Sequence, residues 1–322
     1  MKSFTYLLSS ILVAFVMACL ATPASAQAVR TWVSGVGDDV NPCSRTAPCK
    51  TFAGAISKTA PGGEINCIDP GGFGAVTITK AMTISCEDVE AGISNAGTTG
   101  VIVNAAATDV VVLRGLDIDS ATATPGINGV RFLAGAALHI EECVIRDNSS
   151  AAPNGNGIFF APAAASELYV VNSYITGNGG AGVRVQPSGT GTAKVIIDGS
   201  SIQNNLTGVT ADGTSNVGGG SNITVANSNV SGNNNAGVSM LNPVGGPTLK
   251  IMVDSSAVVN NGALGGLRVD GANATLRVGN STLTGNALAT AIANGGVISS
   301  YGTNKIDGNG NDGPNPPTIP QK

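Results

Sequence analysis

The sequence predicts an all-β protein, a parallel coil in which every turn contributes three short strands. Five positions recur together at intervals of about 25 to 30 residues, which is typical of stacked repeats. Within each copy the apolar residues alternate and are mostly β-branched, which favours strands over helices. Glycine makes up 45 of the 322 residues and asparagine is also frequent. Both residues favour turns, so the composition suits a chain that turns often.

The composition also excludes several classes of protein. A hydrophobic fraction of 42% and a net charge of −4 argue against disorder. The chain has 16 Lys and Arg against 20 Asp and Glu, without a basic stripe. Because binding to a phosphate backbone needs such a stripe, we expect no nucleic-acid partner.

Residues 1–26 have the pattern of an export signal. Lys2 precedes an apolar stretch from Tyr6 to Ala21, and small residues follow up to Ala26. We expect cleavage after Ala26 and no membrane span in the mature chain, which would be secreted, periplasmic or on the cell surface. Two alternatives stay open: an uncleaved membrane anchor, although the stretch is short for one, and lipoprotein processing at Cys19.

Five cysteines follow the predicted signal, and an oxidising compartment would favour disulfides between them. We expect Cys43 to pair with Cys49 and Cys67 with Cys86, which leaves Cys143 as a buried thiol. Zinc binding is the alternative. It would need paired short spacings with a histidine nearby, whereas the single histidine of the chain lies far away.

The repeat is clearest from residue 138 onward. One copy reads Leu138, Ile140, Cys143, Ile145 and Asn148, and the same spacing returns five more times. The last position of the six copies is Asn148, Asn178, Asn205, Asn233, Asn261 and Asn286. In the other five copies the third position is Ser173, Ser200, Ser228, Ser256 and Ser281.

Stacked turns explain these columns. Neighbouring parallel strands lie about 4.8 Å apart, so equivalent residues of successive turns stand directly above one another. We expect the asparagines to form a hydrogen-bonded ladder at one corner, where Asn and Gly also accept the left-handed backbone that a sharp corner needs. We expect the serines to form a second inward column. Both columns are predicted to build the scaffold and not to carry chemistry.

The chain resembles the right-handed parallel β-helix proteins of the pectin-lyase-like superfamily. The repeat carries the resemblance, together with residues 31–35 (TWVSG), 41–43 (NPC), 48–52 (PCKTF) and 62–65 (GGEI). It implies an N-terminal cap over residues 27–61 with a short helix near residues 51–58, a β-helix of nine or ten turns over residues 62–307, and a loose tail over residues 308–322. A cap is also expected physically, because an open coil end exposes unpaired strand edges.

The resemblance also implies a candidate active site. Pectate-lyase-like members are associated with acidic calcium ligands on an outer sheet face and with an Arg or Lys that abstracts a proton next to a uronate. The outward charged residues that could play these parts are Arg146, Asp117, Asp119, Glu141, Glu142 and His139. Calcium would be needed only for this activity, and we expect no other cofactor.

A simpler interpretation of the same cluster is structural. Asp119 and Arg146 occupy equivalent positions of consecutive turns, so an ion pair between adjacent strands accounts for both. Glu141 and Glu142 would fill a solvated corner, and His139 would lie beside Tyr169 of the next turn. We therefore favour a protein without catalysis.

The expected function is binding or adhesion to polysaccharide or cell-surface glycan. Loops of variable length follow the third strand of several turns, and loops on a rigid scaffold are frequent sites of recognition. They span residues 161–167, 186–194, 212–222 and 242–250. The alternative function is a calcium-dependent polysaccharide lyase that acts on uronates.

Overall fold

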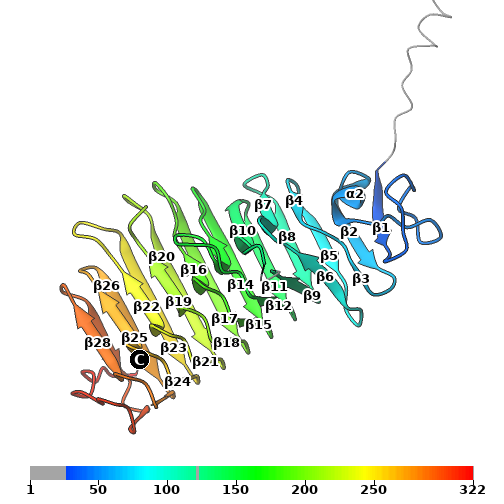
Figure 1. The fold of residues 1–322 in the computed structure, drawn as a ribbon. Helices are drawn as coiled ribbons and strands as arrows, with labels where there is room; N and C mark the ends of the chain where they lie inside the picture. The colour runs from blue at the N-terminus through cyan, green and yellow to red at the C-terminus, as the bar shows by residue number, and fades with distance from the viewer. Residues whose placement is uncertain (1–26, 121–122, 322) are drawn as a thin grey trace, which may run out of the picture.

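The computed structural model describes residues 27–120 and 123–321, and in them the chain forms a parallel β-coil of three sheets (Figure 1). The expected signal peptide, its cleavage after Ala26 and the alternative at Cys19 lie outside the described residues. No helix among the described residues is long and apolar enough to cross a membrane.

Every third strand of the coil joins the same sheet, and the pairing is parallel throughout. The eleven-stranded sheet contains β1 (Ala28–Val33), β2 (Thr59–Cys67), β5 (Met82–Ser85), β8 (Val110–Arg114), β11 (Ala137–Glu141), β14 (Ala165–Val171), β17 (Thr192–Asp198), β20 (Gly220–Ala226), β23 (Thr248–Asp254), β26 (Ala274–Gly279) and β29 (Val297–Ser300). The ten-stranded sheet contains β3 (Gly71–Gly72), β6 (Ala91–Ser94), β9 (Leu116–Asp119), β12 (Val144–Arg146), β15 (Tyr174–Thr176), β18 (Ser201–Gln203), β21 (Asn229–Ser231), β24 (Ala257–Val259), β27 (Thr282–Thr284) and β30 (Lys305–Ile306). The nine-stranded sheet contains β4 (Val76–Ile78), β7 (Thr99–Asn104), β10 (Asn128–Ala134), β13 (Asn156–Phe160), β16 (Ala181–Val185), β19 (Thr207–Asp212), β22 (Ala236–Leu241), β25 (Gly265–Asp270) and β28 (Thr290–Ala293).

The core runs along the axis of the coil. In β11, for example, Leu138 and Ile140 are fully buried, while His139 between them is partly exposed. The next strand of the same sheet repeats this pattern in register, with Leu168 opposite Leu138 and Val170 opposite Ile140. The predicted alternation of inward apolar and outward polar residues is therefore confirmed.

The asparagine ladder is confirmed and extends beyond the predicted copies. The side-chain amide of Asn178 donates to Oδ1 of Asn205 at 2.8 Å, and the backbone N–H of Asn178 donates to the same oxygen at 3.1 Å. The chain of bonds continues to Asn309, whose Oδ1 accepts from Asn286. The serine column is confirmed as well, because Ser200 Oγ accepts the backbone N–H of Ser173.

The expected left-handed backbone is present at this corner, and Asn or Gly adopts it in five of the six turns. It belongs to the residue directly before each ladder asparagine and not to the asparagine itself. These preceding residues are Asp147, Gly177, Asn204, Gly232, Asn260 and Gly285. The ladder side chain must point inward to meet its neighbours, so the sharp turn is made one position earlier, where Gly, Asn and Asp adopt positive φ most easily.

The N-terminal cap contains α2 (Phe52–Ile56), the one helix in the described part of the chain and shorter than the expected 51–58. The Thr51 side chain caps it by accepting from the N–H of Gly54 at 2.9 Å. Asp39 accepts hydrogen bonds from Thr51 and from the backbone of Lys50. Burial alone would raise the pKa of Asp39, but these hydrogen bonds and nearby Lys58 outweigh burial and lower it.

Both expected disulfides are present, Cys43–Cys49 in the cap and Cys67–Cys86 between neighbouring turns. Cys143 is buried, and it is the free cysteine of the described residues. The C-terminal segment, for which the sequence suggested a loose tail, returns to the last turn of the coil. Thr318 pairs in parallel with Ser300, which places the tail beyond the edge of β29.

Candidate functional site

The charged cluster predicted from the sequence is divided between two faces of the coil. Glu141 and His139 belong to β11 of the eleven-stranded sheet. Asp117, Asp119 and Arg146 belong to β9 and β12 of the ten-stranded sheet. The chain turns a corner between these sheets at residue 142, so the predicted residues do not gather into one site.

The corner itself is formed by Glu142. Its backbone has a positive φ of 53°, and its N–H donates to the carbonyl of Val171 on the next turn at 3.0 Å. The predicted corner position of Glu142 is therefore confirmed. Glu141, which was expected in the same corner, is instead the last residue of β11 and is partly covered.

On the ten-stranded sheet, Arg146 is held by carboxylates of the preceding turn. It donates from Nε to Asp117 Oδ1 at 3.1 Å and from Nη2 to Asp117 Oδ2 at 3.0 Å. The same Nη2 lies 3.2 Å from Asp119 Oδ2, and Nη1 lies 3.8 Å from Asp147 Oδ2. The hydrogen bond to Asp117 and the surrounding negative charge raise the pKa of Arg146. A guanidinium held in this way stays protonated and is a poor base.

The predicted ion pair between Asp119 and Arg146 is confirmed, and the two residues are opposite each other in register. Burial raises the pKa of Asp119, the positive charge of Arg146 lowers it, and the nearby carboxylates of Asp147 and Asp117 raise it; the net shift is upward. Asp117 makes the bidentate contact because the long Arg146 side chain extends past Asp119, its partner in register, along β9. Sequence register alone did not indicate this preference.

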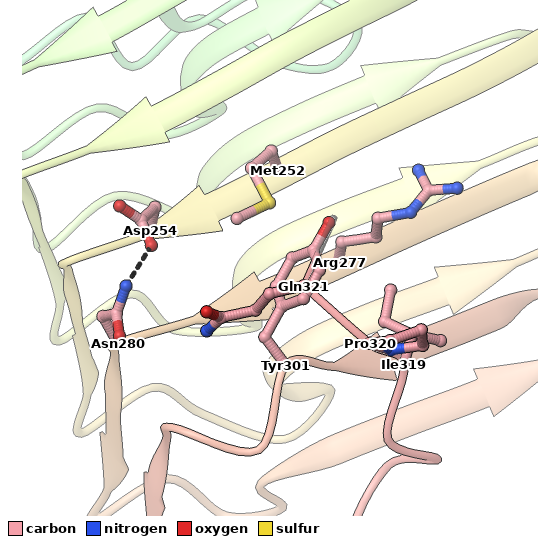
Figure 2. Close-up of a pocket in the computed structure, with 8 residues that line it drawn as sticks. All are labelled: Met252, Asp254, Arg277, Asn280, Tyr301, Ile319, Pro320 and Gln321. Atoms are coloured by element: carbon pink, nitrogen blue, oxygen red, sulfur yellow. Dashed lines mark hydrogen bonds between the residues drawn. The ribbon is translucent and has the colours of Figure 1, made fainter.

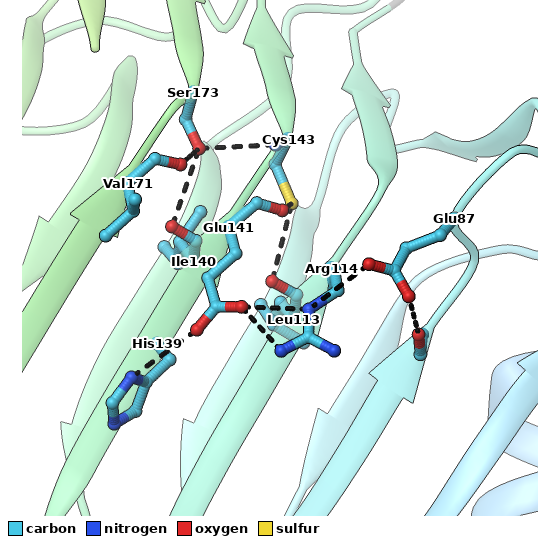
Figure 3. A network of polar contacts seen from close by, with 10 residues as sticks. Glu87, Leu113, Arg114, His139, Ile140, Glu141, Cys143, Val171 and Ser173 are labelled. Carbon is cyan, nitrogen blue, oxygen red and sulfur yellow. Dashed lines mark hydrogen bonds and ion pairs between the residues drawn. The ribbon is translucent and has the colours of Figure 1, made fainter. Parts of the chain in front are cut away.

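A second ionic group lies on the eleven-stranded sheet (Figure 3). Arg114 donates to Glu141 Oε2 from Nη2 at 2.6 Å and from Nε at 2.8 Å, and Glu87 lies 3.7 Å away on the other side. The hydrogen bond to Glu141 and the charge of both glutamates raise the pKa of Arg114 although burial lowers it. This arginine, too, is neutralised within the protein.

His139 stacks on Tyr169, as predicted from the register. The ring centroids are 4.5 Å apart with an interplanar angle of 14°, and His139 Nδ1 lies 3.7 Å from Glu141 Oε1. The Tyr169 hydroxyl donates to Glu167 Oε2 at 2.7 Å. That hydrogen bond, together with one from Lys194, lowers the pKa of Glu167. The arrangement links three neighbouring turns and leaves His139 beside a packed ring.

These acidic residues do not fit a calcium site. Calcium takes six to eight oxygen ligands, supplied by convergent carboxylates, carbonyls and water. Asp117 and Asp119 are instead turned toward the Arg146 guanidinium, and Glu141 lies on a different sheet, where it pairs with Arg114. Within residues 27–120 and 123–321, no group of three His, Cys, Asp or Glu side chains is arranged to hold a metal ion.

Sequence reasoning missed a different part of the eleven-stranded sheet, nearer the C-terminus. Two cations, Lys250 of β23 and Arg277 of β26, face outward there and have no ion-pair partner among the described residues. A hollow of about 370 Å³ lies beside Lys250 and is also lined by Lys194 and Asn222. Lys250 was predicted as the end of the variable loop 242–250, whereas the structure places it inside β23. No motif in the sequence pointed to Arg277.

A larger hollow of about 750 Å³ lies beside Arg277 (Figure 2). Residues of the last strands line one side and the returning tail lines the other. Its lining residues are Met252, Asp254, Arg277, Asn280, Tyr301, Ile319, Pro320 and Gln321. The sequence did not predict this hollow, because the tail carries no repeat that would indicate where it returns.

A third outward group lies on the nine-stranded sheet. The ring of Phe159 has Arg131 on one side, with Cζ 5.5 Å from the ring centroid, and Arg184 on the other at 5.7 Å. Arg184 also pairs with the buried carboxylate of Asp212 at 2.6 Å. Cation–π packing and a buried ion pair account for these side chains, so we assign the group to the scaffold.

The comparisons with known proteins agree with this architecture. No curated protein matches the sequence of the chain. Among solved structures, the crystal structure of pectate lyase Pel9A is similar, with a TM-score of 0.53 and 14% identity over 85% of this chain and 68% of that chain. At this identity the likeness concerns the fold. The family described as right handed beta helix region matches residues 128–310, more than half of the sequence, and the chain therefore belongs to the right-handed β-helix proteins.

Proposed function

We propose that the protein is exported and binds acidic polysaccharide or cell-surface glycan without catalysis, through the C-terminal half of the eleven-stranded sheet. The observation that carries this proposal is the contrast between the cations. Arg114 and Arg146 are neutralised by carboxylates, whereas Lys250 and Arg277 face outward with no carboxylate partner among the described residues. Cations on a rigid outer face attract anionic groups of a polymer that lies across the strands.

The surroundings of these two cations support the same ligand. The hollows of about 370 and 750 Å³ fall within the size range of small-molecule sites and border the same strand, β23. Asn222 and Asn280 supply amides that can bind hydroxyl groups, and Tyr301 adds an aromatic ring. A surface with cations, amides and a ring matches the chemistry of an acidic sugar chain.

Export is supported by the two disulfides. Cys43–Cys49 and Cys67–Cys86 are the kind of bond that persists in oxidising compartments and is rare in the cytosol. A sample isolated from the periplasm, the cell surface or the culture medium should begin at Gln27 by mass spectrometry. A mature protein that still begins at Met1 contradicts cleavage after Ala26, and an acylated N-terminus at Cys19 would establish lipoprotein processing.

The binding proposal is tested with the double variant Lys250→Gln/Arg277→Gln. Protein is co-sedimented with insoluble acidic polysaccharides such as calcium pectate and alginate gels, and with neutral cellulose. We expect retention on at least one acidic material, weaker retention in high salt because exposed charges are screened, and at least a tenfold (about 1.4 kcal/mol) weaker affinity of the double variant.

The matched control is Lys305→Gln, which removes an exposed lysine from the ten-stranded sheet. It should bind like the unaltered protein. If the control and the double variant lose affinity equally, the effect comes from net charge and the proposed face is wrong. Absence of retention on every acidic and neutral material overturns the binding function itself.

The alternative, a calcium-dependent polysaccharide lyase, predicts a different result. Incubation with polyuronates and calcium would then produce unsaturated uronate ends, which absorb in the ultraviolet. We expect no such absorbance, because Arg146 is held by Asp117 and Asp119. Turnover that Arg146→Ala abolishes would establish the lyase and contradict the proposal of a protein without catalysis.

A further inference from the structure

The hollow at the C-terminal end of the eleven-stranded sheet is lined by both apolar and polar side chains. Its floor is the outer surface of β23 and β26, from which Met252 and Arg277 project at directly opposite positions of the two strands. Beyond the last turn it is bounded by Ile319, Pro320 and Gln321. Because the tail pairs through Thr318 with Ser300, this boundary is held in place by backbone hydrogen bonds.

Tyr301 packs closely against Gly279, the last residue of β26. A Cβ atom at Gly279 would lie 3.2 Å from Tyr301 Cδ2, closer than an ordinary contact, and 3.7 Å from Met252 Cε. Glycine therefore leaves the space in which the ring sits against the sheet. The tyrosine ring and Met252, with Ile319 and Pro320 across from them, offer an apolar surface to a flat ligand.

The polar groups of the hollow can both donate and accept hydrogen bonds. Asp254 accepts from Asn280 Nδ2 at 2.9 Å and from Ser255 at 3.0 Å, and its carboxylate oxygens have further acceptor capacity. Arg277 has no ion-pair or hydrogen-bond partner among the described residues, so its guanidinium can donate to a ligand. In Figure 2 the Asp254–Asn280 pair is drawn on one side of Tyr301 and the guanidinium of Arg277 on the other.

We infer that this hollow is a site for a single pyranose ring. The carbon face of such a ring packs on an aromatic side chain, while its hydroxyl groups both donate and accept hydrogen bonds. Tyr301 supplies the first kind of contact, and Asp254, Arg277 and the Gln321 amide supply the second. The inference rests on the proposed function only for the class of ligand, since a single sugar needs no polymer-binding face.

The volume and the boundary support a small ligand. About 750 Å³ exceeds what one sugar ring needs, so the site has room for the ring and its ordered water. The tail bounds the hollow beyond the last turn, and the strand β23 that lines it also lines the smaller hollow beside Lys250. A chain that follows the sheet toward its C-terminal end therefore meets the tail at this hollow.

The experiment uses the full-length protein and soluble methyl glycosides. Saturation-transfer difference NMR is recorded with methyl glucopyranoside, methyl galactopyranoside and methyl galacturonoside at millimolar concentration. We expect transfer to the ring protons of at least one glycoside, and an affinity at least tenfold lower in Tyr301→Ala and in Gln321→Ala. Gln321 is exposed near the chain end, so its variant keeps the fold even if Tyr301→Ala does not.

Tyr174→Ala is the control, because Tyr174 is an exposed tyrosine on a different sheet, outside the hollow. It should bind the glycosides normally. Absence of transfer from all three glycosides, or equal loss in the Tyr174 control and the Tyr301 variant, overturns the inference. Binding of glycosides without retention on any polysaccharide would support this site and contradict the proposed function. Retention on polysaccharide without glycoside binding would support the proposed function and contradict this site.

Discussion

Gly182 lies directly against the side-chain amide of Asn205, on the next turn of the coil. A Cβ atom added at Gly182 would stand 2.9 Å from Asn205 Nδ2 and 2.5 Å from Ile202 Cγ2. The same relationship recurs along the coil, for example between Gly208 and Asn233 at 3.0 Å. Glycine at the start of the strands in the nine-stranded sheet is thus required by the asparagine ladder and not only by the turn.

This relationship predicts that Gly182→Ala is destabilising. The added methyl group must displace a buried ladder amide and the core side chain of Ile202, and overpacking of this kind costs about 1–3 kcal/mol. The midpoint of thermal unfolding, followed by circular dichroism, should fall accordingly. Gly218→Ala is the control, because its Cβ would meet only Thr190 Cγ2 at 3.7 Å. Equal midpoints for the two variants would contradict the steric role of Gly182.

A second prediction concerns Asn205 itself. Asn205→Ala leaves the backbone N–H and the amide of Asn178 without their shared acceptor, and it removes the donor to Asn233. The Asn178 amide still donates to the carbonyl of Thr176, so its backbone N–H is the buried group left without a partner, and we expect a loss of stability of about 1–3 kcal/mol. Denaturant unfolding measures it. Asn222→Ala, which truncates an exposed asparagine outside the ladder, should change stability little, and a similar loss in both variants would argue against the ladder.

The scaffold was predictable because its constraint repeats. Five positions that recur together carry both the period of the turn and the direction of each side chain, so the ladder and the serine column followed from the sequence. The position of the left-handed residue was harder to predict from the sequence, because Asp147, Gly177 and Asn204 differ in type although they share one backbone conformation. Asn204 Oδ1 lies over Gly232 of the next turn, where a Cβ would approach to 2.7 Å, so the residue type at this corner depends on its neighbour in space.

The candidate sites were predictable only in part, for two physical reasons. The register places Arg146 opposite Asp119. The arginine side chain is long and flexible, however, and its guanidinium donates its hydrogen bonds to Asp117. The hollow beside Arg277 depends on where a non-repeating tail returns, and no periodic signal encodes the contact of Thr318 with Ser300. Contacts made once in the molecule were therefore missed, whereas contacts made in every turn were found.

A third prediction follows from the ion pairs of Arg146. Arg146→Ala should cost about 1 kcal/mol or less at neutral pH, because the pair is partly exposed and screened by solvent. The variant should also raise the pKa of Asp119 further, because burial and the neighbouring carboxylates, which already raise it, would then act without the opposing charge of Arg146. NMR titration of the Asp119 carboxyl measures this shift.

The sign of the pH effect is fixed by the direction of that shift. A carboxyl whose pKa is higher in the folded state favours folding below its unfolded pKa and loses this contribution as pH rises through the folded pKa. Arg146→Ala should therefore be more destabilising at about pH 7 than at about pH 3, where Asp119 is protonated. A larger loss of folding stability in Arg146→Ala at the acidic pH would contradict this account of the cluster.

The last prediction concerns the thiol of Cys143. Burial raises its pKa to about 12, and its Sγ contacts the carbonyls of Glu141 and Leu113 inside the coil. Because the thiolate is the reactive form, iodoacetamide at about pH 8 should not modify Cys143 in the native protein. In denaturant without reductant the disulfides stay closed, and Cys143 should then be modified fully. Mass spectrometry of the labelled peptide measures this. Cys143→Ser, which completes the serine column, should keep the fold and, in protein that begins at Gln27 and so lacks Cys19, abolish labelling in denaturant. Rapid modification of native Cys143 would show that the coil opens at this turn and would contradict its assignment to the scaffold.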